Sequence, residues 1–313
     1  MKQLLVLAAA VAAVPATSFG AAYSDNFDTN TSANYTVNAN PDTTVDWAWD
    51  YSTMGIPSAP NSVGGTTKGV KFTANNGDAT AAAAAISISP TGYSVTGDYT
   101  LKFDAWINAN GPFPAGGTGS TEYVTGGVGT TGTSVQSSAT GTGAWFAVDG
   151  EGGASSTSAD FRAYSNISLA TAASGVYAAG IDSNSRDNGN TYYHATFPGG
   201  QKAPQFQQDN YPQQTGELAI GTVGFAWREF VVSKVGDDVT WSMDGLTIAT
   251  LSNQTLSGSN ISVGYWDVFS SISDNAALSF GVVDNLTVVV PEPTSLAALG
   301  LGGLGLLARR RRA

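Results

Sequence analysis

Acidic side chains carry most of the chemistry that this sequence could perform. Between residues 23 and 290 there are four glutamates, Glu122, Glu151, Glu217 and Glu229, and a single histidine, His194. The chain has no cysteine, which excludes disulfides, thiolate nucleophiles and cysteine-bound zinc. The GxSxG, HExxH and Walker A patterns are also absent. His194 is therefore expected to be an ordinary strand or loop residue.

One pair of carboxylates has a spacing that could serve glycoside hydrolysis, which requires two carboxyl groups on opposite sides of the scissile bond. Asp149 and Glu151 are two residues apart, which would place both on one face of a strand. Glycines at positions 150, 152 and 153 indicate a turn instead. The sequence therefore predicts a non-catalytic protein, and a secreted glycoside hydrolase or lyase is the alternative.

Aromatic side chains suggest a different chemistry, because a pyranose ring packs well on an aromatic ring. Val45, Trp47, Trp49 and Tyr51 occupy alternate positions, so one face of a predicted strand would be largely aromatic. We take Trp47, Trp49, Tyr51 and Trp266 as candidate carbohydrate-binding residues. The alternative is that this face points inward and belongs to the core.

Two aspartates near the ends of the predicted body could bind a hard cation such as Ca²⁺, which prefers carboxylate and carbonyl oxygens. Asp28 follows the first strand-like run and Asp284 lies within the last one. If those strands adjoin, the two residues could share a structural calcium ion; solvated turn carboxylates are the alternative. Residues 182–187 begin like a calcium-binding loop, but Arg186 stands at the fifth position and excludes it.

The charge of the chain restricts its partners. The formal net charge is −11, and the region from residue 23 to 290 holds 23 acidic against 8 basic side chains, hence −15. Such a field repels nucleic acid and anionic membrane surfaces. A neutral polysaccharide or a divalent cation is a more compatible partner.

The composition and the local patterns predict an all-β body. Only 12% of the residues are charged, 38 are glycine and 10% are aromatic, which suits short strands joined by many turns. Strand-like runs occupy residues 86–89, 99–107, 144–148, 225–234, 239–243, 246–251, 261–265 and 278–290. Asp244-Gly245 joins two of these runs and is typical of a type I′ hairpin.

Two stretches break this pattern. Residues 111–142 are rich in Gly, Ser and Thr, and residues 154–215 are mostly polar. We expect both to be long loops or low-complexity excursions from one domain over residues 23–290. A domain boundary near residues 111–143 is the alternative.

The two ends of the chain have the composition of targeting segments. Residues 1–22 contain Lys2, an apolar run and then small residues, which is the architecture of a helical signal peptide. Residues 291–313 begin with a proline-flanked tripeptide, continue with an apolar run and end in a basic cluster. The residues of this tail that carry the signal are Pro291, Glu292, Pro293, Arg309, Arg310, Arg311 and Arg312. The apolar run would reach about 22 Å as a helix, a short transmembrane span.

This order of tripeptide, apolar run and arginines resembles the PEP-CTERM protein-sorting signal. The resemblance implies export, transient anchoring in the inner membrane and cleavage by an exosortase. The mature protein would then reside on the cell surface or in the extracellular matrix. An ordinary tail-anchor helix is the alternative.

The body resembles concanavalin A-like and laminin G-like β-sandwiches. The resemblance rests on the opening residues 23–28, the strand at 227–232, the hairpin at 241–251 and the closing strand at 280–288. It implies an antiparallel β-sandwich of the jelly-roll type whose first and last strands lie together. We therefore predict an exported protein that binds carbohydrate or has a structural role within exopolysaccharide. A coat protein without a ligand would bury every large aromatic residue and have no groove.

Overall fold

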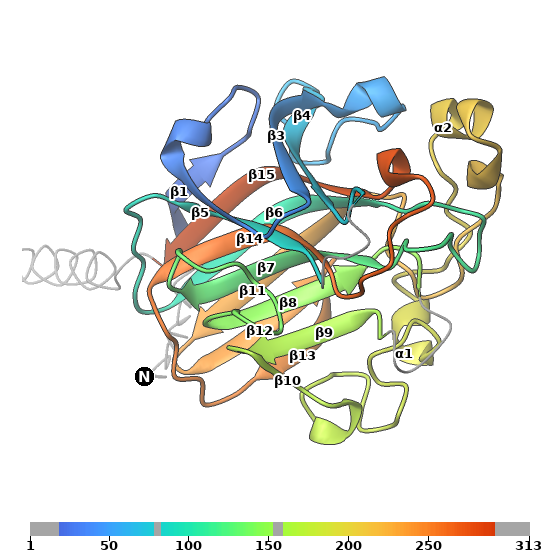
Figure 1. Cartoon of the computed structure of the whole chain (residues 1–313). Helices are drawn as coiled ribbons and strands as arrows, with labels where there is room; N and C mark the ends of the chain where they lie inside the picture. Colours follow the sequence, from blue (N-terminus) through green and yellow to red (C-terminus); the bar gives the residue numbers. More distant parts are fainter. Residues whose placement is uncertain (1–18, 78–82, 153–158, 292–313) are drawn as a thin grey trace, which may run out of the picture.

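The fold consists of two stacked antiparallel β-sheets, as seen in a computed structural model that describes residues 19–77, 83–152 and 159–291 (Figure 1). The strands are β1 (Phe19–Asp25), β2 (Tyr35–Ala39), β3 (Thr43–Asp50), β4 (Lys68–Ala74), β5 (Ala85–Pro90), β6 (Tyr99–Asn108), β7 (Glu122–Thr130), β8 (Ala144–Asp149), β9 (Phe161–Ser165), β10 (Ser168–Leu169), β11 (Arg228–Val235), β12 (Asp238–Met243), β13 (Leu246–Leu251), β14 (Asn260–Asp267) and β15 (Phe280–Pro291). The predicted all-β sandwich is confirmed.

The strand order explains how the two ends of the body meet. Sheet A has the order β13-β12-β11-β6-β15-β4-β3, with β1 paired to β15; sheet B has the order β10-β9-β8-β7-β14-β5-β2. In β15 the first half pairs with β4 and the second half with β1, from Asp25 opposite Leu286 to Phe19 opposite Pro291. The first and last strands therefore lie together, as predicted.

The best local prediction from the sequence is the β12–β13 hairpin. Asp244 and Gly245 have φ angles of 50° and 80°. Both residues of a type I′ turn need positive φ, which Asp tolerates and Gly accepts freely. The turn continues the meander β11-β12-β13 at the edge of sheet A.

The main core lies between the sheets and follows the period-two pattern of the strands. Phe103 of β6 stacks on Phe230 of β11 with ring centroids 4.7 Å apart, and Trp241 of β12 lies 5.3 Å from Phe146 of β8. These rings come from both sheets and are fully or almost fully buried. Figure 1 shows the green strands β7–β9 over the orange strands β11–β13, which is where these side chains meet.

The expectation for residues 111–142 was wrong, because this stretch contains β7, a central strand of sheet B. Its glycines have a packing role. A Cβ on Gly126 would lie 2.7 Å from the Phe230 ring, and one on Gly127 would lie 2.7 Å from Cβ of Trp145. Aromatic side chains thus pack directly on the backbone of β7.

Residues 154–215 also contain regular structure, although they include most of the long excursions. Within the described part of this stretch lie β9, β10, the helices α1 (Thr191–His194) and α2 (Gln205–Asn210), and the 3-10 turns Ala172–Ser174 and Pro212–Thr215. Further 3-10 turns are Ser32–Asn34, Tyr51–Met54 and Ala276–Leu278. Both helices lie at one end of the sandwich, on the right in Figure 1. Neither they nor any other helix of the described ranges has the length and apolar character of a membrane span.

Candidate functional site

A groove with a volume of about 610 Å³ lies on the outward face of sheet A. Its lining comes from β1, the loop after the Tyr51–Met54 turn, β6, β11 and β15. The lining residues are Ser24, Asp25, Asn26, Asn61, Val63, Lys102, Phe103, Glu229, Asn285, Leu286 and Thr287. Most of these side chains carry amide, hydroxyl or charged groups. The groove therefore suits a ligand that is rich in hydroxyl groups.

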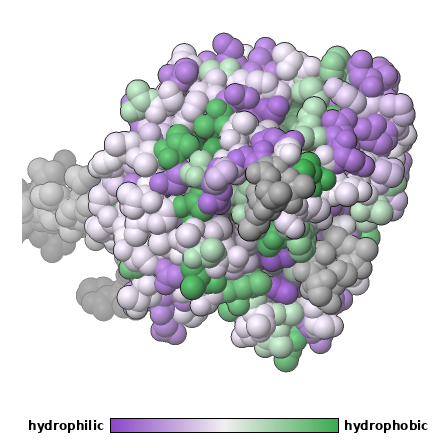
Figure 2. Space-filling view, viewed as in Figure 1, coloured by the Kyte–Doolittle hydropathy of each residue, from purple (hydrophilic) through white to green (hydrophobic). Residues whose placement is uncertain are grey.

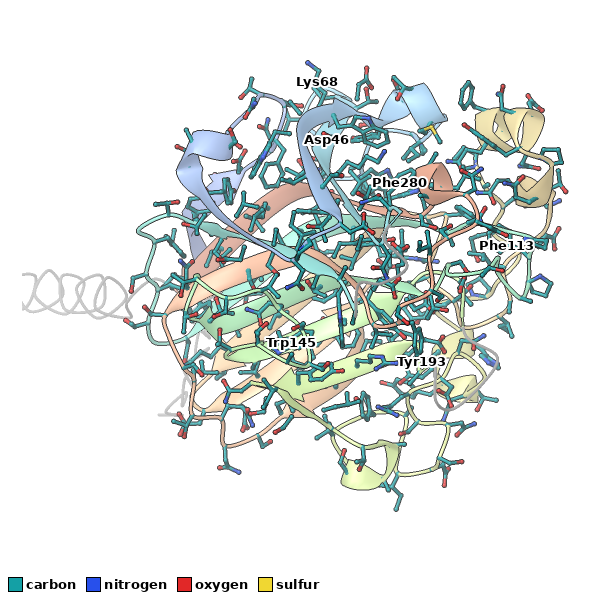
Figure 3. All side chains as sticks on the ribbon, in the orientation of Figure 1. Asp46, Lys68, Phe113, Trp145, Tyr193 and Phe280 are labelled. Carbon is teal, nitrogen blue, oxygen red and sulfur yellow. The ribbon has the colours of Figure 1, made fainter. Side chains whose placement is uncertain are left out.

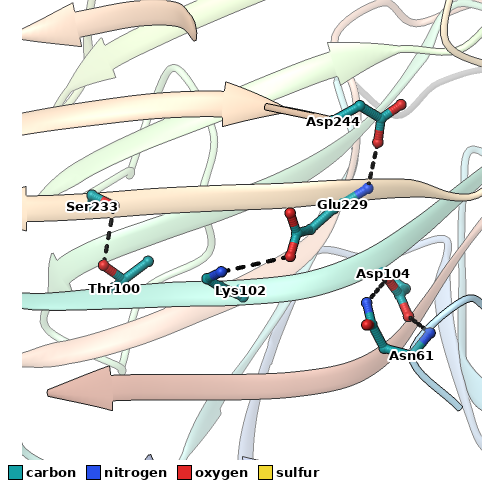
Figure 4. A network of polar contacts seen from close by, with 7 residues as sticks. All are labelled: Asn61, Thr100, Lys102, Asp104, Glu229, Ser233 and Asp244. Atoms are coloured by element: carbon teal, nitrogen blue, oxygen red, sulfur yellow. Dashed lines mark hydrogen bonds and ion pairs between the residues drawn. The ribbon is translucent and has the colours of Figure 1, made fainter. Parts of the chain in front are cut away.

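One wall of the groove is a loop that Asp104 fastens to sheet A (Figure 4). The backbone N–H of Asn61 donates to Asp104 Oδ2 at 3.1 Å, and Asn61 Nδ2 donates to Oδ1 at 2.8 Å. Asn285 of β15 adds a third bond, from its Nδ2 to Asp104 Oδ2 at 2.8 Å. Because Asp104 is 1% exposed, these bonds replace the water that a carboxylate would otherwise bind.

Asp284 anchors the same loop from the neighbouring strand. It lies opposite Asp104 in the β15–β6 register and accepts bonds from Tyr51 Oη and Ser62 Oγ, each at 3.0 Å. Burial raises the pKa of Asp284 to about 7, and the nearby Asp104 carboxylate adds to the shift. A bulge in β15 directly after Asp284 puts Asn285 at a φ of 53° and turns its side chain toward the loop.

The charged groups within the groove are held by partners from the protein. Lys102 Nζ lies 3.6 Å from Glu229 Oε1, and both side chains are about two-fifths exposed, at 41% and 42%. Asp25 accepts bonds from the backbone N–H of Phe27 at 2.9 Å and from Tyr35 Oη at 3.2 Å. Neither carboxylate is a free catalytic group in this arrangement.

A row of hydroxyl side chains continues the outward face of sheet A beyond the groove. The strand registers place Thr100 of β6, Ser233 of β11, Thr240 of β12 and Thr250 of β13 side by side. Thr100 and Ser233 share a hydrogen bond of 3.0 Å, and Thr240 and Thr250 one of 3.1 Å. All four side chains are half-buried. We call these residues the hydroxyl row.

The outward face of sheet B is aromatic and covered. Trp145 (Figure 3) stacks on Tyr164 at 4.1 Å, and Trp266 lies 5.5 Å from Trp145. The guanidinium of Arg162 lies 4.8 Å from the ring centroid of Tyr123. All four rings are at most 1% exposed. We call this set, Tyr123, Trp145, Arg162, Tyr164 and Trp266, the covered face.

The connection between β7 and β8 shields part of the covered face from solvent. Val135 packs with the aromatic rings of the covered face, and the backbone N–H of Gln136 donates to Ser87 Oγ at 3.0 Å. A Cβ on Gly141 would lie 2.5 Å from Trp145 Nε1, so the chain passes directly over that indole. Figure 2 looks onto this side of the molecule and shows apolar residues only in small, separated groups.

Buried carboxylates gather at one end of sheet B. They are Glu122, Asp149, Glu151, Asp160 and Asp267, each at most 2% exposed. The β14–β7 register sets Glu122 opposite Asp267, and the β7–β8 register sets Tyr123 opposite Asp149. We call these five residues the carboxylate cluster.

Four members of the carboxylate cluster, Glu122, Asp149, Glu151 and Asp267, have pKa values above those of free carboxyl groups. Burial is the main cause; it raises the pKa of Glu151 and of Asp267 to about 7. Burial, reinforced by the charge of Asp267, also raises the pKa of Glu122 well above its usual value. Burial and the charge of Glu151 likewise raise the pKa of Asp149 well above its usual value. Carboxyl groups that are buried in this way do not line an open groove, where a glycosidase would need its two carboxyls.

The predicted aromatic face on β3 was wrong. Ala48 has a φ of 52°, and the β3–β4 register shifts between Asp46 and Trp49. This bulge packs the partly buried Trp47 against the main core, where its ring lies 5.0 Å from Tyr35, and puts the partly buried Trp49 on the other side, 5.3 Å from Phe280.

The other two candidate aromatics do not reach the surface. Tyr51 is fully buried and bonds Asp284, while Trp266 is fully buried in the covered face. Among the described residues, the large hydrophobic side chains that are exposed include Phe206 and Phe269, at 45% and 39%. A coat protein without a ligand would bury every large aromatic residue and have no groove. The two exposed rings and the groove on sheet A do not match that alternative.

The two predicted calcium ligands bond separate partners. Asp28 lies beyond the end of β1 and accepts from Asn26 Nδ2, whereas Asp284 accepts from Tyr51 and Ser62. Within the described ranges, no group of three or more histidine or acidic side chains is arranged to hold a metal ion. His194 ends α1, and its Nε2 lies 3.0 Å from the carbonyl oxygen of Asn188.

Sequence reasoning missed Asn61, Lys102 and Glu229 as groove residues. Nothing in their own sequence neighbourhood marks them, because the groove forms from strands and a loop that are distant along the chain. The one available signal was the period-two pattern of β6 and β11. It puts Lys102 and Glu229 on the side away from the core residues Phe103 and Phe230.

A comparison with protein families decides the nature of the C-terminal segment. The model of the PEP-CTERM protein-sorting motif matches residues 289–312. The chain carries a PEP-CTERM motif. This motif indicates an exported protein with a C-terminal membrane anchor that is processed. It begins in the last residues of β15, which ends at Pro291. Glu292, Pro293 and Arg309–Arg312, like residues 1–18 of the predicted signal peptide, lie outside the described residues, whereas residues 19–22 of that predicted segment belong to β1.

Comparisons with solved structures found distant similarities. The metal-free carbohydrate recognition domain of Emp46p is 11% identical, with a TM-score of 0.42, and the match covers 87% of this chain and 97% of that domain. The carbohydrate binding module CBM66 from Bacillus subtilis is 11% identical, with a TM-score of 0.37, and the match covers 79% of this chain and 95% of that module. The Ca²⁺- and Man2-bound VIP36 domain is 9% identical, with a TM-score of 0.40 over 84% of each chain. No curated protein matches this sequence.

Proposed function

We propose that this exported domain binds a neutral polysaccharide in the groove on sheet A and takes no part in its cleavage. The observation that carries the proposal is the lining of the groove. Asn26, Asn61, Asn285 and Thr287 offer amide and hydroxyl groups, and the Lys102–Glu229 pair adds balanced charges. Sugar hydroxyls both donate and accept hydrogen bonds, so they pair with groups of this kind.

An apolar contact completes the groove for a sugar. Val63 lines the groove and is 86% exposed, so it offers an aliphatic surface at the rim. The C–H face of a pyranose can pack against such a surface while its hydroxyls bond the amides. The net charge of −15 on the body favours a neutral glycan over an anionic one.

The sorting motif supports a polysaccharide ligand, because it directs the protein out of the cell. A protein that an exosortase cleaves and sends to the cell surface would meet extracellular polysaccharide as its most abundant neighbour. We propose that the mature domain is retained in that matrix through the groove. The structural neighbours with carbohydrate-binding names are consistent with this function, although their similarity concerns the fold.

The proposal can be tested with the soluble body, residues 23–290, on an array of neutral and anionic polysaccharides. We expect saturable binding to neutral glycans that is insensitive to salt. Val63→Asp should weaken it at least tenfold, because a charge would replace the apolar rim. Val235→Asp is the matched control: Val235 is also exposed, at 63%, but lies outside the groove. No binding by the parent protein, or equal effects of both variants, would refute the proposal. Release of reducing ends would instead support the hydrolase alternative.

A further inference from the structure

We infer that the ligand of this domain is an extended, β-1,4-linked glycan that leaves the groove and runs across the strands along the hydroxyl row. The inference rests on the proposed function and specifies its ligand. The groove and the hydroxyl row share the outward face of sheet A. Lys102 of the groove and Thr100 of the row are two residues apart on β6, which corresponds to about 7 Å along the strand.

The hydroxyl row has hydrogen-bonding capacity left for a ligand. Each hydroxyl can donate once and accept twice. In the Thr100–Ser233 pair one hydroxyl donates to the other, so the O–H of the accepting hydroxyl is not used in that bond; the same holds for Thr240 and Thr250. Four half-buried side chains thus present two donors and several acceptors on adjacent strands.

The geometry of the row favours a linear ligand. Adjacent strands in a sheet are about 4.8 Å apart, so four hydroxyls on β6, β11, β12 and β13 span roughly 14 Å. Only a chain of several sugar units can contact the groove and the whole row together. A β-1,4-linked chain is extended and ribbon-like, whereas α-1,4- and β-1,3-linked glucans coil and would leave the row after a short contact.

The chemistry of this face argues against a protein partner. A second row on the same strands contains Thr287, Lys102, Val231, Ser242 and Thr247, which are mostly polar as well. Protein interfaces have an apolar or aromatic core, and the exposed large hydrophobics of the described residues include no member of either row. The lone charged pair, Lys102 with Glu229, is balanced. A neutral, hydroxyl-rich chain complements such a surface.

The test uses ladders of cello-, manno- and xylo-oligosaccharides, from the disaccharide to the hexasaccharide, with malto- and laminari-oligosaccharides of equal length. For at least one β-1,4 ladder we expect affinity to rise with each added unit and then level off at the longest members. The double variant Thr240→Val and Thr250→Val should weaken hexasaccharide binding about tenfold and leave disaccharide binding unchanged, since it removes hydroxyls beyond the groove.

Thr36→Val is the matched control. Thr36 and Thr91 form a similar hydroxyl pair at 3.0 Å, but they belong to the edge of sheet B. The control should bind every oligosaccharide like the parent protein, and circular dichroism should show all variants folded. Binding that is independent of length, or stronger for coiled glucans, would overturn the inference while the proposed function stands. Dimerisation that the double variant abolishes would assign this face to a second copy of the chain and overturn it too.

Discussion

The outward faces of the two sheets differ in composition and exposure, although the strands of both sheets share the same period-two alternation of side chains. Both sheets bury one side of each strand in the shared core. On sheet A the other side of β6 and β11 carries Thr100, Lys102, Glu229 and Ser233, which are partly exposed, while Trp106 at the far end of β6 is buried in a second apolar cluster. On sheet B it carries Tyr123, Trp145, Tyr164 and Trp266, which other parts of the chain bury completely. A period-two pattern thus identifies a strand but does not say whether its second face meets solvent.

The difference shows where stability and binding are located. The covered face adds a second apolar layer outside sheet B, so substitutions there act mainly on the free energy of unfolding. The hydroxyl row and the Lys102–Glu229 pair, together the open face of sheet A, contribute few apolar contacts, so they can be changed at little cost in stability.

The largest effect is expected for Trp145→Ala on the covered face. The substitution removes the stack on Tyr164 and the bond from Nε1 to the carbonyl oxygen of Asn166, 2.7 Å long. It should lower the free energy of unfolding by about 3–5 kcal/mol, measured by urea denaturation. Thr240→Ala on the open face should change it by less than about 0.5 kcal/mol. Equal effects would mean that the two faces do not differ in stability.

The next effect is a pH dependence that comes from the carboxylate cluster. The pKa of Glu151 is about 7 in the folded protein, above its unfolded value of about 4. The folded state therefore binds more protons between these values, and stability falls as the pH rises from about 4 to about 7. Glu151→Gln should remove up to about 3 kcal/mol of that fall, as seen in denaturation midpoints across this range.

A neighbouring neutral substitution is the control for this pH effect. Thr125→Val lies on the outward face of β7, three residues after Glu122 and on the other side of the strand, and removes no titrating group. It should shift the whole stability profile without altering its slope. A parent protein whose stability rises between pH 5 and pH 8 would contradict the raised pKa values of the carboxylate cluster.

Much of the fold could be predicted from the sequence, because alternation and turn chemistry act locally. The strand at residues 246–251 matches β13, and Asp244-Gly245 forms the predicted turn. β7 could not be predicted in this way, since its glycines are explained only by rings from other strands. The bulge at Ala48 was likewise invisible, because alanine gives no sign of a positive φ.

The candidate site was less predictable than the fold. Asn61 bonds Asp104, 43 residues further along the chain, and the carboxylate cluster joins residues from several strands through register. Register depends on which strands pair, and this sequence shows pairing only for hairpins. The sorting motif could be predicted because it is a contiguous signal that does not depend on folding.

An intermediate effect is expected for Asp104→Ala beneath the open face. The substitution removes the acceptor of three hydrogen bonds, two from Asn61 and one from Asn285. We expect a loss of about 2–3 kcal/mol in unfolding free energy and faster hydrogen exchange at the Asn61 amide. The loop forms a wall of the groove, so glycan binding should weaken in parallel. Unchanged exchange at Asn61 would show that other contacts hold the loop.

The smallest effect on stability is expected for Lys102→Met at the centre of the groove. The ion pair with Glu229 is exposed and 3.6 Å long, so its loss should change the unfolding free energy by less than about 0.5 kcal/mol. The methionine keeps the aliphatic stem but removes a donor from the groove, so affinity for a neutral glycan should fall severalfold. Calorimetry of unfolding and of binding separates the two. If Lys102→Met left binding intact while Trp145→Ala abolished it in folded protein, the ligand would belong to sheet B and the roles of the two faces would be reversed.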